Sequence, residues 1–125
     1  MRNYLLVFLG AGLGGAARHA VNSAALHFFG PGFPFGTLIV NIVGSFLMGA
    51  LVEWFALRAD PGFAWRIFLT TGVLGGFTTF SAFSLDAMAL YEWGEWFSAA
   101  AYVLASVTVA LLGLAAGLFL MRSLA

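Results

Sequence analysis

Charged residues are so widely spaced along this chain that long apolar stretches separate them. The hydrocarbon core of a bilayer is about 30 Å thick, and a helix needs about 20 apolar residues to cross it. Of the 125 residues, 62% are hydrophobic and 8% are charged, whereas about 25% of the residues of a soluble domain are charged. This pattern predicts a membrane protein. The charges lie at Arg2, Arg18, Glu53, Arg58, Asp60, Arg66, Asp86, Glu92, Glu95 and Arg122.

Turn-forming sequences divide the apolar stretches into four segments. The turns are FGPGFP at 29–34, RADPG at 58–62 and YEWGEW at 91–96. The runs between them are about 20 residues or longer, which favours helices over the short alternating strands of a membrane barrel. The sequence therefore predicts an all-α membrane protein with four transmembrane helices in a single domain, 1–125. The expected spans are about 4–27, 35–57, 65–90 and 97–121.

Composition excludes several classes of function. The chain has no cysteine, which rules out disulfides and thiolate metal sites. Its formal net charge is +0, so we expect no nucleic-acid partner. No nucleophile, base and orienting acid converge, so we do not expect an enzyme. The first segment runs on through Arg18, which argues against a cleaved signal peptide.

Pairs of small residues in three spans bear on how the helices assemble. Small residues recur four apart in three spans, a spacing that allows close helix contacts within a bundle or between chains, and from this we expect an oligomer. These pairs are Gly10 and Gly14, Ser45 and Gly49, and Gly113 and Gly117.

The arginines outside the spans all fall on one side of the predicted membrane domain. With four spans, both termini and the second link share that side, which holds Arg2, Arg58, Arg66 and Arg122. The links on the other side contain no Lys or Arg, and Arg18 is the one counterweight. The positive-inside rule predicts that the termini are cytoplasmic.

Polar residues follow helical spacing inside two spans. Thr37, Asn41 and Ser45 share one face of the second span, and Tyr102 and Ser106 share one face of the fourth. An intramembrane asparagine either bonds to a neighbouring helix or lines a pathway. The stripe on which Asn41 lies favours a pathway.

The third span contains the unusual stretch GVLGGFTTFSAFS at 72–84. Its glycines weaken a helix, and the hydroxyls of its threonines and serines can bond to backbone. We expect the third helix to be broken near its middle, with freed carbonyls forming a small cation site; a kinked but continuous helix is the alternative. The residues concerned are Gly72, Gly75, Gly76, Thr78, Thr79 and Ser81.

Aromatic and charged residues flank this break. Phe77, Phe80 and Phe83 recur at steps of three, and the positive ring edge of phenylalanine can face a small anion without holding it too tightly. Arg18 can snorkel, pair with a carbonyl or act as a structural anchor. Asp86 lies either at the membrane interface or in a vestibule.

These residues carry a resemblance to the small bacterial fluoride-channel family known as Fluc or CrcB. The matching stretches are GGAAR at 14–18, GTLIVNIVGSFLMG at 36–49 and GVLGGFTTFSAFS at 72–84, in the order expected across four spans. The resemblance implies a protein of the bacterial cytoplasmic membrane that conducts fluoride passively out of the cell. It also implies an antiparallel homodimer with two pores and a structural sodium ion at the dimer interface.

The resemblance further implies a role for individual residues. Asn41 would hydrogen-bond fluoride, and Phe80 and Phe83 would turn their ring edges toward it. Gly75 and Thr78 would supply main-chain carbonyls to sodium. The complete expected fluoride pore comprises Thr37, Asn41, Phe80, Ser81, Phe83, Ser84, Tyr102 and Ser106, with Arg18 and Asp86 as structural or vestibule residues.

The chain departs from the family pattern at Ala82, Ala110 and Asp86, where the family usually has hydroxyl residues and a glutamate. The arginine bias also leaves a heterodimer with an oppositely oriented paralogue as an alternative to the homodimer.

A small multidrug-resistance-type proton-coupled exporter is the alternative function. That mechanism needs an acid in the first span, which has Arg18 and no acid. A purely structural membrane subunit would not need the broken span, Asn41 and the paired rings together.

Overall fold

The computed structural model describes residues 1–57 and 60–124. It has four helical segments long and apolar enough to cross a membrane: Arg2–Phe29, Phe35–Leu57, Phe63–Glu92 and Trp96–Leu124. The prediction of an all-helical chain with four long apolar spans is confirmed. Arg58, which contributes to the charge bias, lies outside the described residues.

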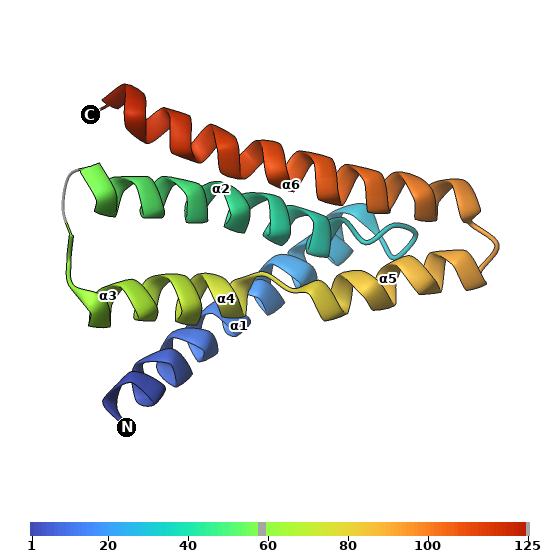
Figure 1. Ribbon diagram of the computed structural model, residues 1–125. Coiled ribbons are helices and arrows are strands. Elements are labelled where there is room, and N and C mark those ends of the chain that lie inside the picture. Colours follow the sequence, from blue (N-terminus) through green and yellow to red (C-terminus); the bar gives the residue numbers. More distant parts are fainter. Residues whose placement is uncertain (58–59, 125) are drawn as a thin grey trace.

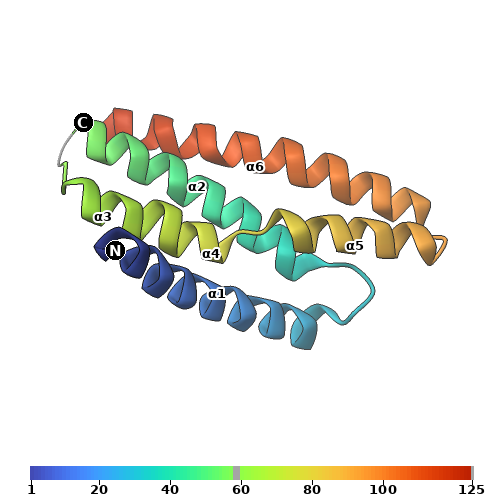
Figure 2. The ribbon, with the colours of Figure 1, turned by 60° about the horizontal axis from the view of Figure 1, so that its bottom comes forward.

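The four spans form a bundle around the second one (Figure 1). Helix α2 (Phe35–Leu57) packs against α1 (Arg2–Phe29), the third span and α6 (Trp96–Leu124). The third span consists of α3 (Phe63–Ile67), the π-helical η1 (Phe68–Leu74), α4 (Gly75–Phe77) and α5 (Phe80–Glu92). Both termini lie at the end of the bundle where α3 begins (Figures 1 and 2).

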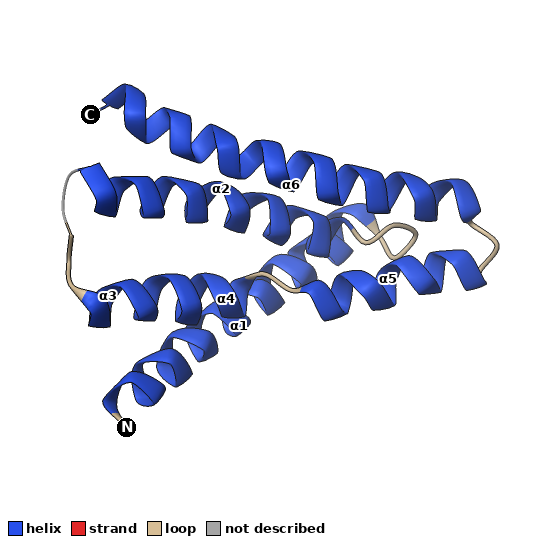
Figure 3. Cartoon of the chain, in the orientation of Figure 1, coloured by secondary structure: helices blue, strands red, loops and turns tan. Residues whose placement is uncertain are grey.

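The third span is interrupted between α4 and α5, where Figure 3 draws a loop inside the line of the helix. Thr78 has φ −90° and ψ 159°, and Thr79 has φ −154° and ψ 128°, so both residues are extended. The predicted break is confirmed, but the expectation that its glycines unwind the helix is wrong. Gly72, Gly75 and Gly76 are all helical, and the chain leaves the helix at the two threonines.

The glycines of the third span serve close packing against α1. A Cβ at Gly76 would meet the carbonyl oxygen of Ala11, and a Cβ at Gly72 would lie 3.1 Å from the Cα of Gly10. On the other side of this contact, a Cβ at Gly14 would meet the carbonyl of Val73. The two backbones therefore approach more closely than any side chain would allow.

Glycines also allow close backbone contact between α2 and α6. A Cβ at Gly49 would meet the carbonyl oxygen of Leu114, and one at Gly117 would meet that of Phe46. Of the two interpretations of this spacing, contact within the bundle or contact between chains, the structure has the first for these glycines. The glycine spacing supplies no argument for an oligomer.

We predict that Gly14→Ala lowers the free energy of unfolding by about 1–3 kcal/mol, because the added Cβ overpacks the contact with Val73. Gly12→Ala on the same helix is the matched control, since a Cβ at Gly12 meets nothing within 4 Å. Unfolding in mixed micelles with increasing SDS measures both variants. Equal stabilities for the two variants would contradict this account of the packing.

Candidate ion pathway and cation site

Asn41 of α2 joins the broken backbone of the third span through two hydrogen bonds. The backbone N–H of Thr79 donates to Asn41 Oδ1 at 2.9 Å, and Asn41 Nδ2 donates to the carbonyl of Thr79 at 3.0 Å. A carboxamide has one acceptor oxygen and two N–H donors. One N–H of Asn41 therefore remains for another partner.

Two carbonyls at the break have lost their usual helical donors. In an α-helix the carbonyl of residue i accepts from the N–H of residue i+4. For Gly75 that donor is Thr79, whose N–H goes to Asn41 instead. For Thr78 the donor is Ala82, whose N–H goes to Thr79 Oγ1 at 3.1 Å. The Gly75 and Thr78 carbonyls are thus free of these bonds.

Arg18 supplies a hydrogen-bond donor to a third carbonyl at the break. Its Nε donates to the carbonyl oxygen of Gly76 at 3.1 Å. The positive guanidinium thereby lies at the C-terminal end of α4, where the helix dipole is negative. Pairing with a carbonyl, one of the alternatives that the sequence left open for Arg18, is the one the structure has.

The threonine hydroxyls also bond to backbone, as the sequence predicted. Thr78 Oγ1 donates to the carbonyl of Leu74 at 2.9 Å, and Thr79 Oγ1 caps α5 by accepting from Ala82. Ser81 differs, because its hydroxyl lies 3.3 Å from Thr79 Oγ1.

A groove of about 380 Å³ runs beside the break between α2, α5 and α6. It brings together predicted pore residues from three spans, and none of the described residues that line it is charged. Its walls include Asn41, Ser45, Thr79, Phe80, Phe83, Ser106 and Ala110, with Met48, Leu111 and Leu114 making one end apolar.

The groove holds a hydroxyl that has no hydrogen-bond partner among the described residues. Ser106 is 6% exposed, and its Oγ is buried without a partner. Such a group is costly to bury unless something else bonds to it. Ser106 is therefore available to a small acceptor in the groove.

The two phenylalanines differ in exposure. Phe83 is 8% exposed and packs against Tyr102, whereas Phe80 is 78% exposed. Their ring centroids lie 5.5 Å apart with the planes at 50°. Phe77 does not line the groove and is half-buried.

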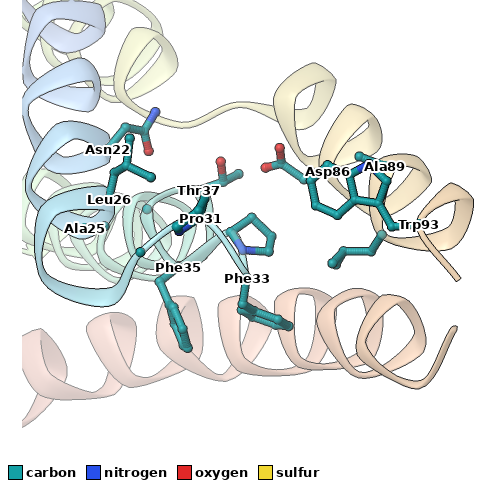
Figure 4. Close-up of a pocket in the computed structure, with 14 residues that line it drawn as sticks. Asn22, Ala25, Leu26, Pro31, Phe33, Phe35, Thr37, Asp86, Ala89 and Trp93 are labelled. Atoms are coloured by element: carbon teal, nitrogen blue, oxygen red, sulfur yellow. The ribbon is translucent and has the colours of Figure 1, made fainter. Parts of the chain in front are cut away.

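A second cavity, which we call the vestibule, has a volume of about 290 Å³ and lies near the link between α1 and α2. Its polar side chains are Asn22, Thr37 and Asp86, which Figure 4 shows around one open space. The hydroxyl of Tyr102 donates to Asp86 Oδ2 at 3.1 Å. Asp86 thus lines a vestibule rather than only the membrane interface.

The predicted stripes are divided between the two cavities. On α2, Thr37 lines the vestibule, whereas Asn41 and Ser45 line the groove. On α6, Ser106 lines the groove and Tyr102, which is fully buried, bonds to the vestibule residue Asp86.

Ser81 and Ser84 are not brought into either cavity. Both are exposed, and Ser84 Oγ donates to the carbonyl of Phe80 in its own helix at 3.0 Å. Asn22 is the vestibule residue that the sequence prediction missed. Its signal was a polar side chain one helical turn after Arg18, on the same face of an apolar span.

Comparison of the sequence with known proteins identifies a family that it matches. The family model described as CrcB-like protein, Camphor Resistance (CrcB), matches residues 5–118. The fluoride-specific ion channel FluC of Granulibacter bethesdensis is 57% identical over 124 residues, which cover 99% of this chain and 98% of that protein. The FluC of Methylobacterium nodulans is 57% identical over 122 residues, 98% of each chain. FluC 2 of Nitrobacter hamburgensis is 54% identical over 122 residues, again 98% of each chain.

We predict that Tyr102 and Asp86 stabilise the fold as a pair. Tyr102→Phe should lower the free energy of unfolding by about 1–3 kcal/mol, because it leaves the Asp86 carboxylate without this donor. Unfolding in SDS-containing micelles measures the effect, and a double-mutant cycle with Asp86→Ala isolates the coupling. Tyr91→Phe, on the exposed face of α5, is the control. Additive effects of the two changes would argue against the pair.

Proposed function

This chain belongs to the CrcB-like family, and on that premise we propose that it forms a passive, fluoride-selective channel. Its four long apolar helices and its bacterial relatives identify it as a multi-pass protein of the bacterial cytoplasmic membrane. The observation that carries the proposed activity is the groove, in which an amide donor, an unpartnered hydroxyl and phenylalanine rings meet without a basic residue.

The chemistry of the groove suits a small anion in transit. The spare N–H of Asn41 and the hydroxyl of Ser106 can replace part of the hydration shell of fluoride. The positive edge of the Phe83 ring adds a weak attraction. Since the described residues that line the groove include no Lys or Arg, the ion is bound weakly enough to leave. We propose that fluoride passes from this groove past Tyr102 into the vestibule.

We further propose that a structural sodium ion is held by the main-chain carbonyls of Gly75 and Thr78. Their fit is supported by the loss of their helical donors, since hard cations prefer oxygen ligands. Among the described residues, no group of three or more His, Cys, Asp or Glu could hold a metal instead. When bound, sodium would neutralise the negative ends of these carbonyls and stabilise the break.

An antiparallel homodimer is the assembly that we propose. Phe80, Ser81 and Ser84 lie exposed on α5, and Gly75 is exposed just before the break. The carbonyl of Gly75, freed of its helical donor at membrane depth, needs a partner other than lipid. A second copy of the chain would cover this face and place the exposed Phe80 beside the partner, giving two equivalent pores.

We predict that liposomes containing the purified protein release fluoride much faster than chloride. Ser106→Ala should lower the fluoride flux about tenfold, because the groove loses a hydroxyl donor. The matched control is Thr108→Ala, which removes a hydroxyl from the exposed face of the same helix. A fluoride-selective electrode measures the flux. Equal release of both ions, or uptake of a cationic drug driven by a pH gradient, would defeat the channel proposal.

We predict dual insertion of this chain, as an antiparallel homodimer requires. The chain has no native cysteine, so Asn3→Cys and Glu95→Cys can report opposite sides of the membrane. Each variant should be labelled partly by a membrane-impermeant maleimide applied to intact cells. Labelling at only one of the two positions would show a single orientation, which the arginine bias favours and which would require an oppositely oriented partner chain.

A further inference from the structure

We propose that Asn41 is the positioning residue of the break, in addition to facing the groove. Its effect on fluoride flux rests on the proposed function, whereas its hold on the backbone does not. The inference starts from the two hydrogen bonds that join the Asn41 carboxamide to Thr79, 38 residues away in the sequence.

The extended backbone of Thr79 creates the need for such a partner. With φ −154° and ψ 128°, Thr79 lies in the β region. Within an antiparallel sheet, a residue of this kind exchanges two bonds with one residue of the neighbouring strand. Here no neighbouring strand exists among the described residues, and lipid offers no hydrogen bond.

The side chain of Asn41 replaces that missing strand. Its oxygen accepts from the N–H of Thr79, and its nitrogen donates to the carbonyl of the same residue, at 2.9 Å and 3.0 Å. A carboxamide presents an acceptor and a donor side by side, as the N–H and C=O of one extended residue do. A shorter serine at position 41 would have a single hydroxyl in place of these two separate groups.

The two hydrogen bonds between the Asn41 carboxamide and Thr79, which we call the clamp, link the two proposed ion sites. By taking the N–H of Thr79, Asn41 keeps the Gly75 carbonyl free of its helical donor. With its remaining N–H, the same carboxamide can donate into the groove. Asn41 therefore lies between the carbonyls assigned to a cation and the groove assigned to an anion.

Hydrogen–deuterium exchange at the Thr79 amide tests the clamp without measuring transport. The purified protein in lipid nanodiscs is exchanged, and electron-transfer fragmentation resolves single amides. Asn41→Ala should speed exchange at Thr79 about tenfold, because the amide loses its acceptor. Exchange at Thr78 should change little, since its N–H donates to the carbonyl of Leu74. Ser45→Ala, in the same groove and on the same helix face, is the matched control.

Asn41→Asp separates the two roles of the residue. It retains an oxygen acceptor for the Thr79 N–H but loses both carboxamide N–H groups, the one that donates to the Thr79 carbonyl and the one that faces the groove. Exchange at Thr79 should therefore stay within about twofold of the wild type, while the fluoride flux falls about tenfold or more. Should Asn41→Ala fail to fold, the Asn41→Asp variant still tests the clamp.

Two results would overturn the inference: unchanged Thr79 exchange in Asn41→Ala, or accelerated exchange in Asn41→Asp. A different result would contradict the proposed function, namely the absence of fluoride flux through the wild-type protein. Accelerated Thr79 exchange in Asn41→Ala would support the clamp in that case also.

Discussion

The need of buried backbone groups for partners, in a membrane that supplies none, governs the rest of this structure. At the break in the third span, Thr79 bonds to Asn41 and the carbonyl of Gly76 bonds to Arg18. Both partners come from other helices, so the break can exist only inside the assembled bundle. The carbonyls of Gly75 and Thr78 lose their helical donors at this break, and they are the groups that we propose as cation ligands.

Close helix contacts bring these partners within reach. Gly10 and Gly14 let α1 lie directly on the third span, so that Arg18, one turn further on, meets the carbonyl of Gly76. Gly44 of α2 packs against the side chain of Thr78, beside the bond between Asn41 and Thr79. The glycines thus act on the site indirectly, because larger residues would move the two polar side chains away from the backbone that they satisfy.

The candidate site was predictable to the extent that it lies on regular helix faces. The stripes on α2 and α6 follow from helical spacing, and the structure places Asn41 and Ser106 in one groove. Spacing could not show that Thr37 belongs to a separate vestibule or that Asn22 joins it, because this depends on the link between α1 and α2. Nor could spacing show that Ser81 and Ser84 are exposed, since the extended residues Thr78 and Thr79 interrupt the helical periodicity between α4 and α5.

The sequence by itself determined the membrane setting, the number of spans, their helical nature and the existence of the break, because these depend on local hydrophobicity and local hydrogen-bonding competition. Tertiary structure alone decided where the break falls and which groups remain free. The glycines pointed to unwinding at Gly72–Gly76, yet those residues stay helical and Thr78 and Thr79 do not. The physical reason is that Asn41 and Arg18 are distant in sequence, and only the packed bundle brings their hydrogen-bonding groups to the two threonines and to Gly76.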